Sequence, residues 1–127
     1  MDGVKGFGIP VDDMERAIRF YRSVFDWRIE HIKGSGGNFH GTQTTDVNVN
    51  GDPLTPGAIN GGLFLRGTND VGNTMLEVRV SSIDDCIDKV ISGGGTVIRP
   101  KVRLLDFALY AIVKDTEGNT LGLWQDL

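Results

Sequence analysis

The sequence predicts an α+β protein made of two tandem modules, each with the order strand, helix and three strands. The first observation is an internal repeat, because a shift of 69 positions places Phe7, Ile9 and Val11 on Leu76, Val78 and Val80. The second is a helical period of apolar residues after each of these strands. The third is a set of short glycine clusters at the expected strand ends. We expect one domain over residues 1–127, with modules of about 1–67 and 68–127, since about 60 residues with one helix form a marginal unit alone.

The first half begins with a predicted strand from Val4 to Val11, in which apolar residues alternate. An apolar stripe from Met14 to Phe25 predicts a helix that begins near Asp12 or Asp13, since aspartate caps free backbone amides. Three further extended segments are predicted at Trp27 to Lys33, Asn38 to Asp46 and Ala58 to Leu65.

The second half repeats this order from a strand at Thr74 to Val80. Its helix is expected to begin after Ser82, with Asp85 as the partner in a capping box, and to end at Gly93. The later extended segments are Thr96 to Val102, Phe107 to Lys114 and Thr120 to Gln125.

We expect the two modules to pair their strands into one curved, mostly antiparallel sheet with the helices on one face. Strand alternation assigns the residues of the opposite, open face. They are Gly6, Gly8, Met75, Glu77, Arg79, Gly122 and Trp124. Glycines inside strands often mark the close approach of a ligand, so these glycines predict room for a bound molecule.

Charge and composition exclude several classes of partner. The net charge of −4 and the pI near 5.0 offer no basic surface to nucleic acid or to an anionic membrane. No apolar run is long enough to cross a bilayer, and the first residues lack the pattern of a signal peptide. Cys86 is the only cysteine, so no internal disulfide can form. These features together predict a cytoplasmic protein.

Glu77 is the candidate catalytic residue, because a carboxylate in a dry cavity can act as a general base. It lies two positions from Arg79, so a surface ion pair or a dimer contact is the competing interpretation. The two histidines, His31 and His40, lie on neighbouring predicted strands. With Glu77 they would offer an atypical metal site, although lone histidines on strands are usually solvated.

Two aromatic residues, Tyr110 and Trp124, are candidates for the walls of a pocket, and His40 is counted with the expected pocket residues. An aromatic side chain on the open face offers a large apolar surface with a polar tip, which suits a planar or apolar ligand. Ordinary packing in the core or in a dimer is the competing interpretation. Phosphate-binding loops and the common zinc motifs are absent from the sequence.

Both ends of the chain resemble the vicinal oxygen chelate superfamily, which contains glyoxalase I, the bleomycin resistance proteins and the extradiol dioxygenases. The resemblance rests on GIPVDDMERAIRFYRSVFDW near the start and on GGGTVIRPK and KDTEGNTLGLWQ near the end. Within this superfamily, the sequence is similar in particular to the glyoxalase-related branch. The resemblance implies two βαβββ modules that form an open barrel around a cavity, commonly completed by dimerisation, with a small-molecule ligand as the partner.

Metal-using members of this superfamily bind a divalent ion with His, Glu or Gln side chains from the first and last strands of each module. The resemblance places those ligands at Gly6, Met75, Gly122 and a position near Gly61 to Leu63. None of these residues offers the oxygen or imidazole ligands that such an ion needs. We therefore predict no cofactor, with a divalent metal ion as the alternative.

The favoured prediction is a metal-free, glyoxalase-like homodimer that binds a small apolar or aromatic molecule between its modules, as bleomycin resistance proteins do. The alternative is an enzyme, namely a lyase, isomerase or dioxygenase that uses either an atypical metal site or Glu77 as a general base. A purely structural dimer or partner module is a third interpretation, and it would have a closed cavity.

Overall fold

Two successive sets of one strand, one helix and three strands make up the computed structural model, which describes all 127 residues. The first set is β1 (Val4–Val11), α1 (Met14–Phe25), β2 (Arg28–His31), β3 (Phe39–Gln43) and β4 (Asn60–Leu65). The second set is β5 (Met75–Arg79), α2 (Ile83–Ser92), β6 (Thr96–Leu104), β7 (Ala108–Lys114) and β8 (Thr120–Asp126). The predicted α+β class and its two tandem βαβββ modules are confirmed.

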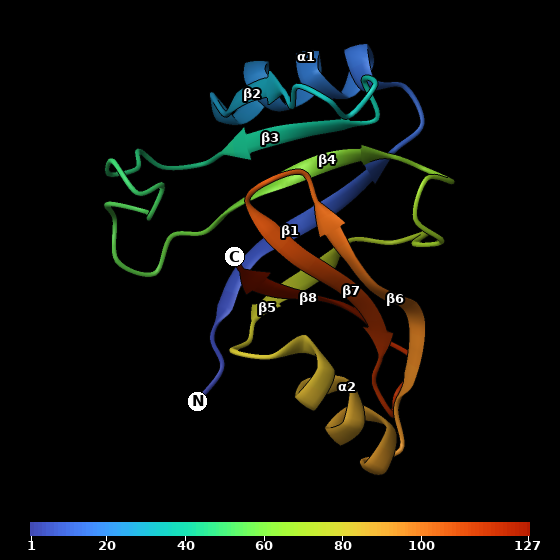
Figure 1. Cartoon of the computed structure of the whole chain (residues 1–127). Coiled ribbons are helices and arrows are strands. Elements are labelled where there is room, and N and C mark those ends of the chain that lie inside the picture. Colours follow the sequence, from blue (N-terminus) through green and yellow to red (C-terminus); the bar gives the residue numbers. More distant parts are fainter.

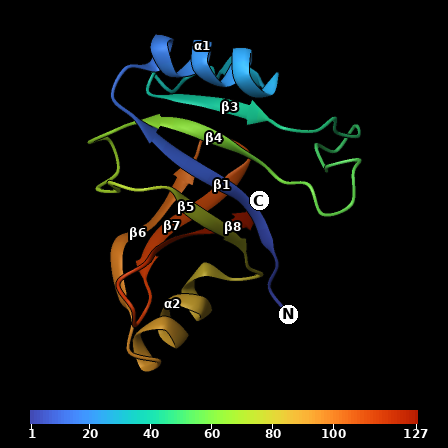
Figure 2. The same ribbon diagram turned by 180° about the vertical axis from the view of Figure 1, so that it is seen from behind.

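All strands belong to one 8-stranded sheet with the order β2-β3-β4-β1-β5-β8-β7-β6. The pairs β1–β4 and β5–β8 are parallel, whereas the other neighbouring strands are antiparallel. The modules meet where β1 pairs with β5. Figure 1 shows the sheet curving between α1, which lies beside β2 and β3, and α2, which lies below β7 and β8. The reverse view in Figure 2 shows β1 crossing the centre of the molecule between β4 and β5.

Both helices begin at the caps that the sequence predicts. The Asp13 carboxylate accepts a hydrogen bond from the Arg16 amide at 3.0 Å, and the Ser82 hydroxyl accepts one from the Asp85 amide at 3.2 Å. These bonds satisfy amides that the first helical turn leaves free. Helix α2 ends at Gly93 as predicted, whereas α1 ends at Asp26, which adopts the left-handed conformation with φ 58°.

Each helix covers its own part of the apolar core. Under α2, five buried residues form a cluster, and they are Val80, Ile83, Ala111, Val113 and Leu123. Under α1, the buried cluster contains only Val11, Ile29 and Leu63, and no residue of α1 itself is fully buried. The half-buried apolar face of α1 completes this second cluster.

Strand alternation puts Leu76 on the same side of β5 as Val78 and Val80, but Leu76 is not buried in the core there. Val80 is buried and Val78 packs against the α2 cluster, but the side chain of Leu76 is 46% exposed. Helix α2 therefore covers only the end of β5 that leads into it. Neither helix has the length and apolar character needed to cross a membrane.

Candidate functional site

A third apolar cluster lies on the sheet face that carries no helix. Its buried members are Phe64, Val71, Met75, Tyr110 and Ile112, and no residue of α1 or α2 packs against it. All of these residues except Val71 line the floor of a cavity of about 480 Å³. A cavity of this volume is in the range of binding sites for small molecules.

Four segments build the walls of this cavity. The turn between β2 and β3, together with β3 itself, contributes Ile32, Gly34, Ser35, Asn38, Phe39 and Gly41. The tip and inner face of the β6–β7 hairpin contribute Arg99, Val102, Arg103, Leu104, Leu105, Phe107, Tyr110 and Ile112. Strand β4 and the connection after it contribute Gly61, Phe64, Thr68 and Asn69. Strands β5 and β8, which lie side by side, contribute Met75, Glu77 and Trp124.

Four of the predicted pocket residues therefore line the cavity, and they are Met75, Glu77, Tyr110 and Trp124. Met75, Glu77 and Tyr110 are buried, with exposed fractions of 4, 7 and 8%. Trp124 is half-buried at one side of the cavity. Strand alternation assigns Met75, Glu77 and Trp124 to this face, whereas Tyr110 was a candidate only as an aromatic residue.

The predicted glycines lie on the same face, but the structure gives a different reason for them. A Cβ atom at Gly8 would lie 3.1 Å from the Phe64 ring and 3.2 Å from the Met75 methyl group. At Gly122 it would collide with the Tyr110 hydroxyl. The space that these glycines leave is filled by side chains of the protein, so they shape the floor of the cavity from behind.

Glu77 and Tyr110 form the polar centre of this floor. The Tyr110 hydroxyl donates a hydrogen bond to Glu77 Oε1 at 3.2 Å. Burial raises the pKa of the Glu77 carboxyl, although Lys5 and the bond from Tyr110 oppose this shift. Burial and the neighbouring Glu77 also raise the pKa of the Tyr110 hydroxyl. The pair thus places one buried carboxyl and one neutral hydroxyl within reach of an otherwise largely apolar cavity.

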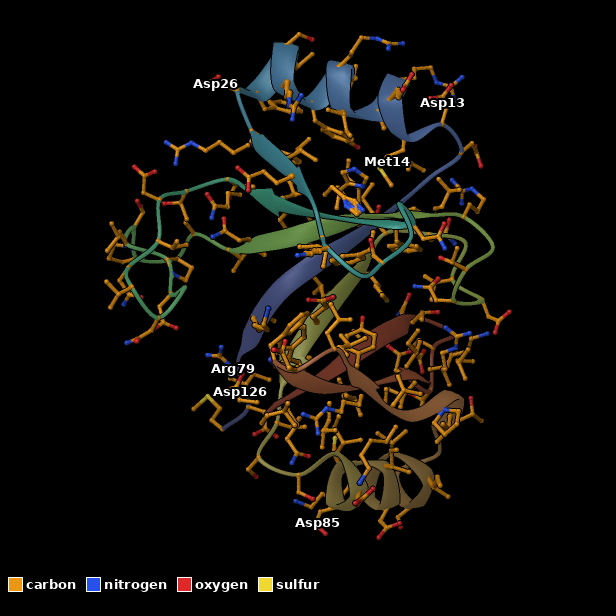
Figure 3. The ribbon with its side chains drawn as sticks, turned by 45° about the horizontal axis from the view of Figure 1, so that its top comes forward. Asp13, Met14, Asp26, Arg79, Asp85 and Asp126 are labelled. Atoms are coloured by element: carbon orange, nitrogen blue, oxygen red, sulfur yellow. The ribbon has the colours of Figure 1, made fainter.

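Arg79 lies on the open face but outside this cavity. Its Nε atom pairs with Asp126 at 3.1 Å, and the same aspartate accepts a hydrogen bond from Trp124 Nε1 at 2.8 Å. Figure 3 shows Arg79 and Asp126 close together at the end of the sheet. Asp126 therefore fixes both the guanidinium and the indole that forms the side of the cavity.

His40 points to the opposite face of the sheet from the cavity. Its neighbours Phe39 and Gly41 line the cavity, and alternation directs His40 toward the α1 face. There its ring meets that of His31 at 5.4 Å between centroids. Burial, with smaller effects of His31 and Arg22, lowers the pKa of His40. The structure does not bring Glu77 to these two histidines, and no group of three His, Cys, Asp or Glu side chains could hold a metal ion.

The positions that correspond to metal ligands in the resembling superfamily do not fit a divalent cation. The space beside Gly6 and Gly122 is occupied by Glu77, which approaches the Cβ positions of both glycines to 3.2 Å. Met75 offers only a thioether, which is a poor ligand for a hard cation. The single carboxyl of Glu77 does not replace several oxygen or imidazole ligands.

Sequence reasoning missed much of the apolar wall, in particular Phe39, Phe64, Leu104 and Phe107. Phe39 lies two positions from Gly41 in β3, and Phe64 lies two positions from Gly62 in β4, so the members of each pair point to the same face of the sheet. Strand alternation would therefore have placed both phenylalanines on the open face. Leu104 and Phe107 lie at the tip of the β6–β7 hairpin. Their contribution depends on how far this hairpin curls over the sheet, and no local pattern encodes that.

Comparison with protein families agrees with the fold. The model of the glyoxalase/bleomycin resistance protein/dioxygenase superfamily matches residues 3–123. The chain belongs to this superfamily.

Among curated proteins, the chain is similar to CFP32, which carries the provisional name of a glyoxylase. It is 30% identical to CFP32 of Mycobacterium bovis over 121 residues, which cover 89% of this chain. CFP32 of Mycobacterium tuberculosis gives the same figures. The matched region spans 41% of the length of these relatives.

Solved structures of the superfamily share the fold at lower identity. Methylmalonyl-CoA epimerase from Mycobacterium tuberculosis is 18% identical to this chain with a TM-score of 0.66. The superposition covers 98% of this chain and 88% of the epimerase chain. The epimerase from Streptomyces coelicolor, solved with 2-nitronate-propionyl-CoA, is 15% identical with a TM-score of 0.68, covering 97% and 96%. A superfamily member from Vibrio splendidus is 11% identical with a TM-score of 0.63, covering 99% and 100%.

Proposed function

We propose that this superfamily member binds a small, largely apolar or aromatic molecule in the cavity between its modules and holds no resident metal ion there. The observation that carries the proposal is the cavity of about 480 Å³, with Phe39, Phe64 and Trp124 in its walls and a single polar pair at its floor. Apolar walls with a few placed polar groups are the usual construction of small-molecule sites. The CoA ester analogue bound by the Streptomyces epimerase supports a small-molecule role for the same fold.

The absence of a resident metal is proposed from the chemistry of the residues present. Glycine and methionine stand where the superfamily resemblance places metal ligands, and Glu77 fills the space between the glycines. The homodimer and the cytoplasmic location remain predictions.

A second candidate function is enzymatic, with Glu77 as a general acid or base. A buried carboxyl with a raised pKa, facing a cavity, is a typical feature of such residues. Replacing Glu77 with Gln separates the two functions. A binding protein would keep its affinity for its ligand, whereas an enzyme would bind its substrate but lose turnover.

The binding proposal is tested with the neutral fluorescent aromatic N-phenyl-1-naphthylamine, on untagged protein whose metal content is measured in the same preparation. We expect saturable binding of one probe per chain and no stoichiometric metal. Val102→Trp fills the cavity from its exposed rim and should weaken binding at least tenfold. Val24→Trp is the matched control, because Val24 is similarly exposed on α1 and does not line the cavity.

Two results would overturn the proposal. Non-saturable binding, or equal affinity in the Val102→Trp and Val24→Trp variants, would show that the cavity is not a binding site. One metal ion per chain, lost on replacement of Glu77, would refute the metal-free assignment and favour an enzyme.

A further inference from the structure

A β-bulge directs Lys5 to the open face of the sheet. Regular alternation would place Lys5 with Phe7 on the face covered by α1. The pairing of β1 with β5 shifts register between Val4 and Gly6, and such a shift re-aims the side chain within it. As a result, the Lys5 ammonium lies 3.8 Å from the centre of the Trp124 ring.

The ammonium of Lys5 has no anionic partner within the chain. None of the ion pairs in the structure includes it. Burial lowers its pKa, and Glu77 is the main charge that opposes this shift. Glu77 and Asp126 act on this ammonium only from beyond ion-pair distance, and its close contact is the face of Trp124. Because a charge removed from water is normally paired, this half-buried ammonium favours an anionic ligand.

A second cleft, of about 310 Å³, opens beside this ammonium. Lys5 and Arg79 form one side of it, and the loop over residues 51–59 forms the other. Asp52 is the only acidic residue in its lining, so two cations face one carboxylate there. Asp126 forms an ion pair with Arg79 but does not line the cleft. In Figure 3 the Arg79–Asp126 pair marks this end of the sheet, near the beginning of β1.

The cleft and the apolar cavity are neighbours. Trp124 lines the cavity, while Lys5 covers its ring from the direction of the cleft. In β4, Asn60 lines the cleft and the next residue, Gly61, lines the cavity. A molecule that extends past the edge of the indole would thus reach from apolar walls to a pair of cationic side chains.

We propose that Lys5 and Arg79 bind an anionic group, such as a carboxylate, on the same molecule whose apolar part occupies the cavity. The inference rests on the proposed function and narrows its ligand class to small aromatic or apolar acids. Arginine and lysine side chains together offer the charge and the directed donors that carboxylates require.

The test uses two probes with the same aromatic skeleton. 8-Anilino-1-naphthalenesulfonate differs from N-phenyl-1-naphthylamine only by its sulfonate group, so the ratio of their dissociation constants reports the contribution of the anion. We expect the native chain to bind the sulfonate more tightly. Lys5→Met should weaken sulfonate binding about tenfold and leave the neutral probe within twofold, and Lys5→Arg should restore the preference.

Lys33→Met is the matched control, because it removes the same charge from an exposed residue that does not line the cleft. Arg79→Gln gives an independent second variant, checked by circular dichroism for an intact fold. Equal losses in Lys5→Met and Lys33→Met, or no preference of the native chain for the sulfonate, would overturn the inference. If the native chain binds neither probe, the proposed function itself fails, so the two failures are distinguishable.

Discussion

The two modules share one order of strands and helix, but they contribute different kinds of residue to the cavity. All of its ionisable lining residues, which are Glu77, Arg99, Arg103 and Tyr110, come from the second module. The first module contributes aromatic walls and glycine backbone, with Phe39, Phe64 and Gly61 as examples. A repeat can therefore keep its scaffold in both halves while one half carries the chemistry.

The two helices also differ, because α2 is more deeply buried at its start than α1. Ile83, at the start of α2, is fully buried, whereas its repeat partner Met14, at the start of α1, is half-buried. The second module thus combines the more firmly anchored helix with the ionisable groups of the site. A rigid support is what a preorganised site requires.

The largest expected effect comes from this matched pair of helix anchors. Ile83→Ala should lower the free energy of unfolding by about 4 kcal/mol, since it leaves a cavity in a closed cluster. Met14→Ala should cost about 1 kcal/mol, because its side chain remains partly in water. Urea unfolding followed by circular dichroism measures both values. Equal losses of unfolding free energy in the two variants would show that the two helices are anchored alike, which would contradict the firmer anchoring of α2.

A smaller effect is expected where glycines make room for side chains in each module. Gly122→Ala forces the Tyr110 ring aside, and Gly62→Ala does the same to the Phe39 ring. Each should cost about 2 kcal/mol through overpacking. Gly72→Ala is the control, because a Cβ atom there meets nothing within 4 Å.

The two glycine variants should differ in their response to pH. Only Gly122→Ala disturbs the hydrogen bond between Tyr110 and Glu77, so only this variant should change how the melting temperature varies with pH. An identical pH profile in both variants would show that the hydrogen bond from Tyr110 does not influence the titration of Glu77.

The smallest expected effect is the pH dependence caused by Glu77. The pKa of its carboxyl is raised above 4.5 in the folded state, so folding favours the protonated form. The resulting stability is complete below about pH 4.5 and is lost as the pH rises toward the folded-state pKa. Glu77→Gln lacks this loss, so its stability relative to the native chain should increase between pH 4.5 and 7.

Thermal unfolding across this pH range measures the difference. Glu30→Gln is a suitable control, because Glu30 is an exposed glutamate on β2. A constant difference between Glu77→Gln and the native chain would show that Glu77 titrates as it does in water.

Local patterns predicted the elements and most of the faces. Alternation placed Met75, Glu77 and Trp124 on one side of the sheet because strands β5 and β8 are regular over these residues. Lys5 was not predicted, since the bulge in β1 breaks that regularity and leaves no signal in residue type. His40 was predicted to line the pocket, although it is the direct neighbour of Phe39 in β3 and therefore points to the opposite face of the sheet. The residues at the tip of the β6–β7 hairpin line the cavity because the hairpin curves over the sheet. The alternation of residues along a strand carries no information about that curvature.

The position of β1 at the centre of the sheet has a consequence for synthesis on the ribosome. This strand is synthesised before both of its partners, which begin only at Asn60 and Met75. At translation rates of about 5–20 residues per second, it stays unpaired for roughly 3 to 10 s. Gly6, Gly8 and Pro10 lower the tendency of such a segment to form cross-β contacts with other chains. Gly6 and Gly8, beside which side chains of the cavity floor pack in the folded protein, thus also lower the tendency of the nascent chain to aggregate.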